Sequence, residues 1–134
     1  MKKISTFNPK PKKKPINMTK LKAKAWKVFS LWVRTKDGGV CYTCKKAGLT
    51  GSNYHAGHFI SRKHNATMFD ERNVRGQCMF CNLWDYGNSG AFAKNIITDH
   101  GQEVFEELVA KSRTTYPFKV DELKGIIDKY ALVD

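Results

Sequence analysis

Two pairs of cysteines constrain this 134-residue chain more than any other feature. Cys41 and Cys44 form one C-x2-C pair, and Cys78 and Cys81 form the other. This spacing lets a tight backbone turn direct two thiolates at one ion, so two such turns can supply a tetrahedral zinc site. The alternative is a pair of disulfides in a secreted protein, but the lysine-rich N-terminus lacks the apolar run of a signal peptide. We therefore expect structural zinc and a reducing compartment.

The net charge of +12 is unevenly distributed. Residues 1–98 carry 19 basic and four acidic residues, whereas residues 99–134 carry five basic and eight acidic ones. Such a positive field attracts polyanions, of which DNA and RNA are the obvious examples, although a lysine run can also serve only solubility. No stretch is apolar enough to cross a membrane, so we expect no membrane partner and a cytoplasmic location.

The N-terminal residues predict a disordered basic arm over residues 1–18, followed by a single domain over residues 19–134. The arm holds six lysines and three of the four prolines, and it has too few apolar residues to offset the entropy of ordering. Thr19 is predicted to cap a helix that ends at the turn Asp37-Gly38-Gly39. One face of this helix is apolar and consists of Leu21, Ala25, Val28, Phe29 and Trp32.

The segment between the cysteine pairs predicts a short hairpin. Residues 54–60 and 73–77 have strand-like patterns, and the polar residues 61–72 between them indicate a loop. Four helical segments are expected to follow: residues 82–86 up to Gly87-Asn88, a helix capped by Ser89 and ending at Gly101, and two more on either side of a turn at Pro117. Together these elements predict an α+β fold.

Several blocks of residues between positions 26 and 100 resemble a known nuclease family. The order of C-x2-C, a strand histidine, a middle asparagine and C-x2-C-N resembles HNH endonucleases, which implies a zinc-stapled treble clef with a ββα-metal core. The blocks FSLWVRTKDG, CYTC, AGHFISR, FDERN, QC-x2-CN and GN are similar to the lambda-type phage NinG family, also called Rap, of recombination nucleases. A phage origin would place the protein in the host cell cytoplasm.

The resemblance implies roles for three residues. His58 stands where HNH enzymes have the general base, and a neutral imidazole can take a proton from an attacking water. Asn82 matches a ligand of the catalytic divalent ion, Mg²⁺ or Mn²⁺, because its carbonyl is a hard oxygen donor. Its alternative role is a helix cap. Asn73 matches the middle asparagine of the catalytic motif, and its expected task is to hydrogen-bond the loop backbone.

The sequence departs from the wider HNH pattern at Gly57, where many members have an aspartate ligand. His55, Asp85 and Asn88 are possible replacements, and spacing alone does not select among them. Arg62, Lys63 and Arg75 flank the expected site and suit phosphate contacts, with solubility as the alternative. His64 and His100 have weaker claims, as a loop residue and as a charge near a helix C-terminus.

These features predict a metal-dependent, structure-specific DNA endonuclease that hydrolyses phosphodiester bonds. The resemblance implies branched recombination intermediates, such as Holliday junctions or D-loops, as substrates. The main alternative is a noncatalytic zinc-containing module that binds DNA or assists recombination. A zinc-bearing RNA-binding protein ranks last because the aromatic residues are expected on helix faces. Symmetrical junction resolution would favour a homodimer, but the sequence does not distinguish this from a monomer.

Overall fold

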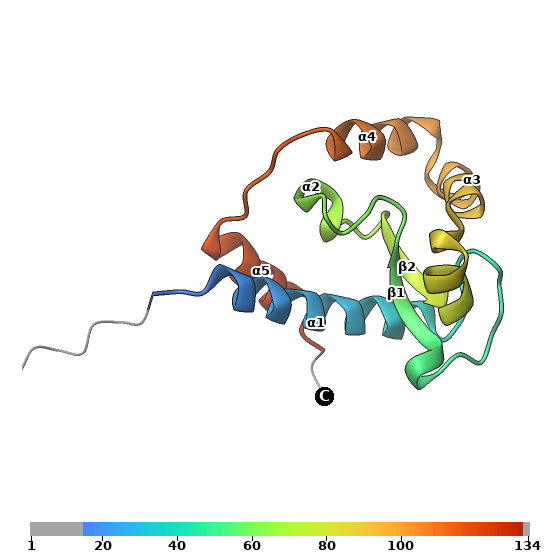
Figure 1. The fold of residues 1–134 in the computed structure, drawn as a ribbon, viewed down its shortest axis with the longest axis horizontal. Helices are drawn as coiled ribbons and strands as arrows, with labels where there is room; N and C mark the ends of the chain where they lie inside the picture. The colour runs from blue at the N-terminus through green and yellow to red at the C-terminus, as the bar shows by residue number, and fades with distance from the viewer. Residues whose placement is uncertain (1–14, 133–134) are drawn as a thin grey trace, which may run out of the picture.

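The structure is a computed structural model and describes residues 15–132, so residues 1–14 of the predicted arm lie outside the described residues (Figure 1). Its longest element is α1 (Met18–Asp37). Asn17, whose side chain accepts a hydrogen bond from the Lys20 backbone N–H at 3.2 Å, caps α1, so the predicted cap at Thr19 is wrong. The predicted end is confirmed, because Gly38 closes the helix with a positive φ of 63°.

The predicted hairpin is confirmed as two antiparallel strands, β1 (Tyr54–His58) and β2 (Val74–Cys78). β1 ends two residues before the predicted boundary, since the Ile60 backbone N–H donates to the side chain of Asn73 rather than to a strand partner. Tyr54 pairs with Cys78 and His58 with Val74, so the second cysteine pair follows directly from the hairpin. The connecting loop contains a short helix, α2 (Asn65–Met68), that the sequence analysis did not predict.

The hairpin has two different faces because side chains alternate along a strand. Ala56 lies on the face that packs against α1, in a core cluster with Phe29, Val33 and Val74. The opposite face carries residues 55, 57 and 77 and lies against the segment that follows the second cysteine pair. The hairpin is thus held between α1 on one side and the second cysteine turn on the other.

One turn of π-helix, η2 (Phe80–Trp84), includes Cys81 and continues beyond it, where the sequence predicted a helix over residues 82–86. The Asp85 backbone N–H donates to the Phe80 carbonyl at 2.9 Å, five residues back, which is the π pattern. Two short 3-10 turns complete the irregular structure, η1 (Gly51–Asn53) before β1 and η3 (Tyr86–Asn88) after η2.

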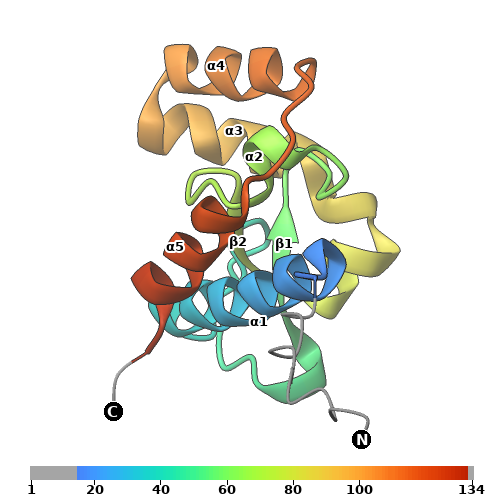
Figure 2. The same cartoon turned by 90° about the vertical axis from the view of Figure 1, so that its left-hand side faces the viewer.

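Three helices complete the described chain: α3 (Ser89–His100), α4 (Gln102–Ser112) and α5 (Val120–Tyr130). Ser89 is the first residue of α3 rather than its cap, which corrects the prediction. α3 and α4 pack together, and α5 lies alongside α1 at the other end of the hairpin (Figures 1 and 2). The α+β class is confirmed. Among residues 15–132, no helix has the length and apolarity needed to span a bilayer.

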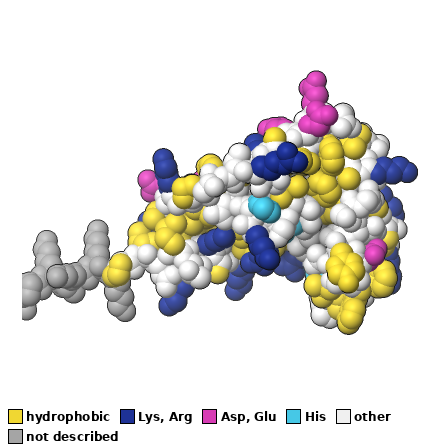
Figure 3. All heavy atoms as spheres, turned by 45° about the horizontal axis from the view of Figure 1, so that its top comes forward, with side chains coloured by type: hydrophobic (Ala, Val, Ile, Leu, Met, Phe, Trp, Pro, Cys, Tyr) yellow, Lys and Arg dark blue, Asp and Glu magenta, His cyan; other side chains and the backbone are white. Residues whose placement is uncertain are grey.

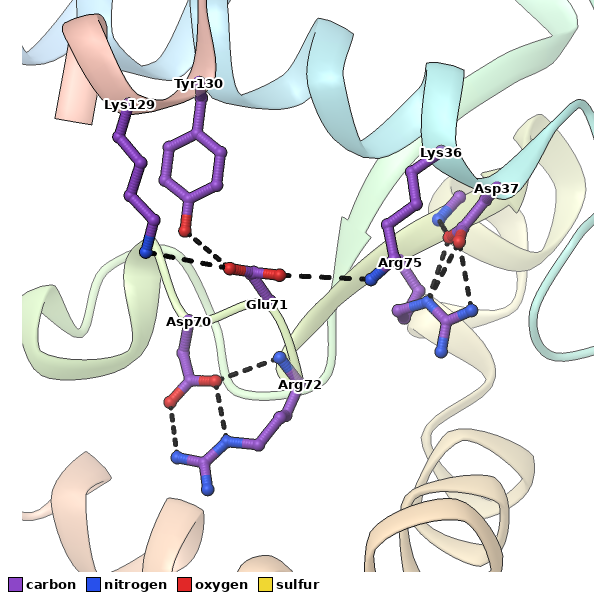
Figure 4. A network of polar contacts seen from close by, with 9 residues as sticks. Lys36, Asp37, Asp70, Glu71, Arg72, Arg75, Lys129 and Tyr130 are labelled. Atoms are coloured by element: carbon purple, nitrogen blue, oxygen red, sulfur yellow. Dashed lines mark hydrogen bonds and ion pairs between the residues drawn. The ribbon is translucent and has the colours of Figure 1, made fainter.

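Polar contacts tie the loop before β2 to the surrounding helices (Figure 4). Asp70 and Arg72 form a close ion pair at 2.8 Å, and Arg72 also reaches Glu107 on α4 at 3.0 Å. Glu71 accepts a hydrogen bond from the Tyr130 hydroxyl on α5 at 2.8 Å. This loop therefore contacts both α4 and α5, and these contacts fix the start of β2.

Candidate metal and catalytic site

The four cysteine thiols come together at one point. The two cysteine turns bring all four sulfur atoms within 4.8 Å of one another. In each turn the backbone N–H of the second cysteine donates to the first sulfur: Cys44 to Cys41 at 3.4 Å, and Cys81 to Cys78 at 3.4 Å. The predicted convergence of the two pairs is confirmed, and the cluster can hold a metal ion.

The protonation of these thiols fits a cation-binding centre. Burial raises the pKa of Cys81 to about 12. Burial also acts to raise the pKa of Cys41, but hydrogen bonds from the Thr43 hydroxyl and from backbone N–H groups lower it to about 6. Crowded thiols can all ionise only when a cation balances their charge. Four soft thiolate donors are the ligand set that zinc takes in structural sites.

His58 is the last residue of β1, and its surroundings fix its tautomer. Nε2 lies 3.1 Å from the Met68 carbonyl oxygen, which only accepts, so Nε2 carries the proton and Nδ1 has a free lone pair. Trp26 of α1 stacks on the imidazole at 4.8 Å between ring centroids. Burial and, to a smaller extent, the positive charge of Arg62 lower the pKa of His58 to about 4, against the opposing effect of the Met68 hydrogen bond. His58 is therefore neutral at physiological pH.

Asn82 lies within η2 and contacts the opposite face of the hairpin. Its amide nitrogen is 3.0 Å from His55 Nδ1. His55 Nε2 lies 2.9 Å from the Ser52 carbonyl oxygen, so the imidazole donates there and accepts the hydrogen bond from Asn82. This arrangement makes His55 the residue that orients Asn82 and gives Asn82 a role other than a helix cap.

Asn73 is fully buried and has all its polar atoms engaged. Its side-chain oxygen accepts from the Ile60 backbone N–H at 2.7 Å, and its amide nitrogen donates to the carbonyls of Ile60 at 3.0 Å and Thr67 at 2.9 Å. These bonds close the loop between β1 and β2. They match the loop-holding role expected of Asn73.

The three predicted phosphate contacts are placed differently. Arg75 forms a bidentate ion pair with Asp37, with its Nε 2.9 Å from the carboxylate, so its guanidinium already has a structural partner (Figure 4). Arg62 and Lys63 are exposed, and the Arg62 guanidinium lies over the Trp26 ring at 5.0 Å. Figure 3 shows Lys and Arg side chains on several sides of a histidine on one face of the molecule.

Of the other candidates, Asn88 contacts the cysteine cluster, whereas Asp85, His64 and His100 are exposed. Asn88 donates to the Cys81 sulfur at 3.6 Å. Asp85 is exposed at the end of η2, and His64 and His100 are exposed. None of these residues contacts His58 or Asn82 among the hydrogen bonds of residues 15–132.

Sequence reasoning missed the exposed side chains of the segment around η2. Phe80 is 63% exposed, Trp84 is 70% exposed and Tyr86 is 93% exposed, whereas the aromatic residues were expected mostly on helix faces. It also missed Trp26, which was not among the residues assigned to the apolar face of the first helix but stacks on His58. In both cases the signal lies in tertiary packing rather than in local pattern.

The fold and the cysteine cluster define a small α+β protein with a candidate metal centre next to a two-stranded hairpin. The chain belongs to the Bacteriophage Lambda NinG protein family, whose model matches residues 3–133. The similarity thus extends over nearly the whole sequence.

The relatives share moderate identity with this chain. Protein ninG of Escherichia phage 933W and that of Enterobacteria phage VT2-Sa are each 29% identical over 108 residues, which is 79% of this chain and 52% of the relative. Protein ninG of Escherichia phage lambda is 27% identical over 108 residues, with the same coverage. The chain therefore spans about half the length of these relatives. No solved structure matches it.

Proposed function

We propose that the chain is a metal-dependent endonuclease that hydrolyses phosphodiester bonds in branched DNA. The observation that carries this proposal is the hydrogen bond from His58 Nε2 to the Met68 carbonyl. It leaves the proton-accepting nitrogen, Nδ1, available on a residue that burial holds neutral. A neutral, oriented imidazole is what a general base requires.

In this proposal His58 takes a proton from the attacking water at Nδ1. Its stack on Trp26 and its bond to Met68 restrict the ring, so the entropy of positioning the base is paid during folding. The low pKa favours the neutral form in the free protein, and nearby DNA phosphates would raise it by stabilising the imidazolium. General base catalysis of this kind contributes typically about 10²- to 10⁴-fold.

The divalent cation implied by the family resemblance, Mg²⁺ or Mn²⁺, fits the amide oxygen of Asn82. When bound, such a cation stabilises negative charge on the leaving 3′ oxygen, so the products would carry a 5′ phosphate and a 3′ hydroxyl. Asn82 lies on the opposite face of β1 from His58, and His58 is the last residue of that strand. A phosphodiester lying across the end of β1 would be accessible from both faces.

The exposed residues support DNA as the substrate class. Arg62 and Lys63 lie exposed in the loop after β1, and Arg62 is close enough to His58 to lower its pKa. Phe80, Trp84 and Tyr86 expose large aromatic surfaces in the segment that contains Asn82. Unpaired bases stack on such side chains, and branch points in DNA offer unpaired bases more readily than a continuous duplex does. Zinc in the cysteine cluster would hold this segment in place.

A noncatalytic zinc-containing module that binds DNA is the second candidate. It is favoured by one observation: among residues 15–132, the metal-ligating cluster is the four cysteines, and it includes no carboxylate. The two readings share the cysteine centre, the basic charge and the aromatic surface. Only cleavage separates them.

The test is a cleavage assay on a four-way DNA junction and on a duplex of the same sequence. Zinc-loaded protein is assayed with Mg²⁺, with Mn²⁺ and with chelator, beside His58→Ala and the matched control His100→Ala, which removes an exposed histidine at the end of α3. We expect His58→Ala to lower cleavage by about 10²-fold or more while DNA affinity stays the same. Tight junction binding without cleavage under either ion would establish the noncatalytic reading.

A further inference from the structure

We infer that the side-chain oxygens of Gln77 and Asn82 together form the divalent-cation site, with Gln77 in the role that a carboxylate at position 57 would otherwise fill. This inference rests on the proposed function, since the cation would serve cleavage at His58. It assigns a role to Gln77, a residue that no sequence motif singled out. The argument depends on how hydrogen bonds fix the two amide groups.

Gln77 is a fully buried polar residue whose oxygen has no hydrogen-bond partner among residues 15–132. Its amide nitrogen donates to the Thr43 hydroxyl at 3.0 Å and to the Gly87 carbonyl at 2.8 Å. Because a carbonyl only accepts, the nitrogen must be the atom that faces Gly87, and the amide cannot be flipped. Buried carbonyl oxygens without a partner are uncommon and call for a physical explanation.

The orientation of Asn82 is fixed in the same way. The Ser52 carbonyl requires the proton of His55 to lie on Nε2, so His55 Nδ1 is an acceptor. Asn82 must then present its nitrogen to His55, and its oxygen turns toward the hairpin. His55 and Gln77 face each other across the two strands. His55 orients the Asn82 amide, and Gln77 supplies the second amide oxygen.

Both amide oxygens lie next to Gly57. A Cβ atom at this position would stand 1.8 Å from Gln77 Oε1 and 3.1 Å from Asn82 Oδ1. Glycine is therefore required for Gln77 to reach this point, and a side chain at position 57 would displace the glutamine oxygen. Two convergent, hard and neutral oxygen donors suit Mg²⁺ or Mn²⁺ rather than zinc.

The geometry also decides between the replacements that the sequence left open. Nδ1 of His55 is occupied by Asn82, Asn88 is bonded to the Cys81 sulfur, and Asp85 is exposed at the end of η2. Gln77 is the residue that combines burial, a fixed orientation and a free oxygen. Because both donors are neutral, the protein alone should bind the ion weakly, with dissociation in the millimolar range, and phosphate oxygens of DNA would complete the coordination.

The test uses the fact that the sequence contains only two glutamines, Gln77 and Gln102. Full-length, zinc-loaded protein labelled with ¹³C at the glutamine side-chain carbonyl gives two NMR signals, which the Gln102→Ala variant assigns. Gln102 lies on α4, where its amide nitrogen is 3.3 Å from Glu106, and it serves as the internal control. Mg²⁺ is titrated into the millimolar range, and Mn²⁺ is added in trace amounts.

We expect Mg²⁺ to shift the Gln77 carbonyl signal and trace Mn²⁺ to broaden it before the Gln102 signal. Asn82→Asp, which adds a negative ligand, should tighten the apparent Mg²⁺ affinity seen at Gln77 by about tenfold or more. Gly57→Ala should weaken the response of the Gln77 signal, because the new methyl group moves the glutamine oxygen. Zinc content and thermal unfolding are measured for every variant to confirm that it folds.

The inference fails if the Gln77 signal of folded protein responds to neither ion, or if it responds no more than that of Gln102. In that case Gln77 has only a structural role, with its oxygen filling the space that a side chain at position 57 would take. The proposed function is judged separately by the junction assay. If cleavage depends on His58 but the Gln77 signal does not respond to either ion, Gln77 is not a cation ligand, while the proposed endonuclease function still stands.

Discussion

The burial of His58 predicts a specific dependence of stability on pH. The pKa of its imidazole is about 4 in the folded protein, against an ordinary value of 6.5, because burial penalises the charged form. Between these two values the unfolded chain binds a proton and the folded chain does not. The stabilisation from the neutral histidine is therefore complete above about pH 6.5, declines as the pH falls toward 4, and falls no further below that.

The size of this effect follows from the two pKa values. Their separation, at about 1.4 kcal/mol per pH unit, corresponds to about 3 kcal/mol in the free energy of unfolding. The variant His58→Phe keeps an aromatic ring against Trp26 but cannot titrate. Its free energy of unfolding should start lower, because the hydrogen bond to Met68 is lost, and should then decline less between pH 6.5 and 4.

Two measurements check this prediction. Urea unfolding of both proteins at several pH values gives the slope of the free energy of unfolding against pH for each. Acid release of metal from the cysteines affects both proteins equally, so it cancels in the difference between the two slopes. NMR titration of the four histidines gives the pKa of His58 directly, with the other three as references. A His58 that titrates near 6.5, or equal slopes for the two proteins, would refute the buried neutral imidazole and weaken its assignment as an oriented base.

Three further predictions address the parts around the site. Cys78→Ser, or strong chelator, should remove bound metal and lower the melting temperature sharply, because four-thiolate zinc binding contributes on the order of 10 kcal/mol to folding; elemental analysis and thermal unfolding measure this. Asn73→Ala should lower the free energy of unfolding by about 2–4 kcal/mol without changing metal content, since it leaves buried backbone groups of the loop unpaired; a smaller loss in urea unfolding would contradict the buried network. Deleting residues 1–14 removes six lysines but keeps the Asn17 cap, and it should weaken DNA binding and flatten its salt dependence by about 0.9 per lost phosphate contact; an unchanged slope would exclude a role of the arm.

Much of the fold could be predicted from the sequence because short-range patterns determine it. The C-x2-C spacing fixes each cysteine turn, and the strand pattern on either side of the loop gave the hairpin within two residues of its observed ends. The start of α1 was missed by two residues because Asn17 and Thr19 are both competent caps. Which of them caps depends on where the helix meets the core, and that information is not local.

The candidate site was less predictable because its key contacts join distant segments. Arg75 has the residue type of a phosphate contact, but Asp37 at the end of α1 engages it, 38 positions earlier in the chain. In the sequence Gln77 is an ordinary strand residue. Only the structure shows that Gly57, on the partner strand, leaves space for its side-chain oxygen. The contact between Trp26 and His58 likewise joins two distant segments, so the sequence could not predict that Trp26 stacks on the imidazole.

Few acidic residues in the first 98 positions are left without a partner. Residues 1–98 contain four acids, and three of them have partners in the structure: Asp37 with Arg75, Asp70 with Arg72, and Glu71 with the Tyr130 hydroxyl. The fourth, Asp85, is exposed at the end of η2. In the proposed function, a DNA phosphate that approaches His58 and the two amides would meet three acids that already have partners, with Asp85 as the remaining acid of this part of the chain. If His58, Asn82 and Gln77 act as proposed, two neutral amide donors need phosphate oxygens to complete the coordination of the cation, and we therefore expect the ion and the DNA to bind together rather than in sequence.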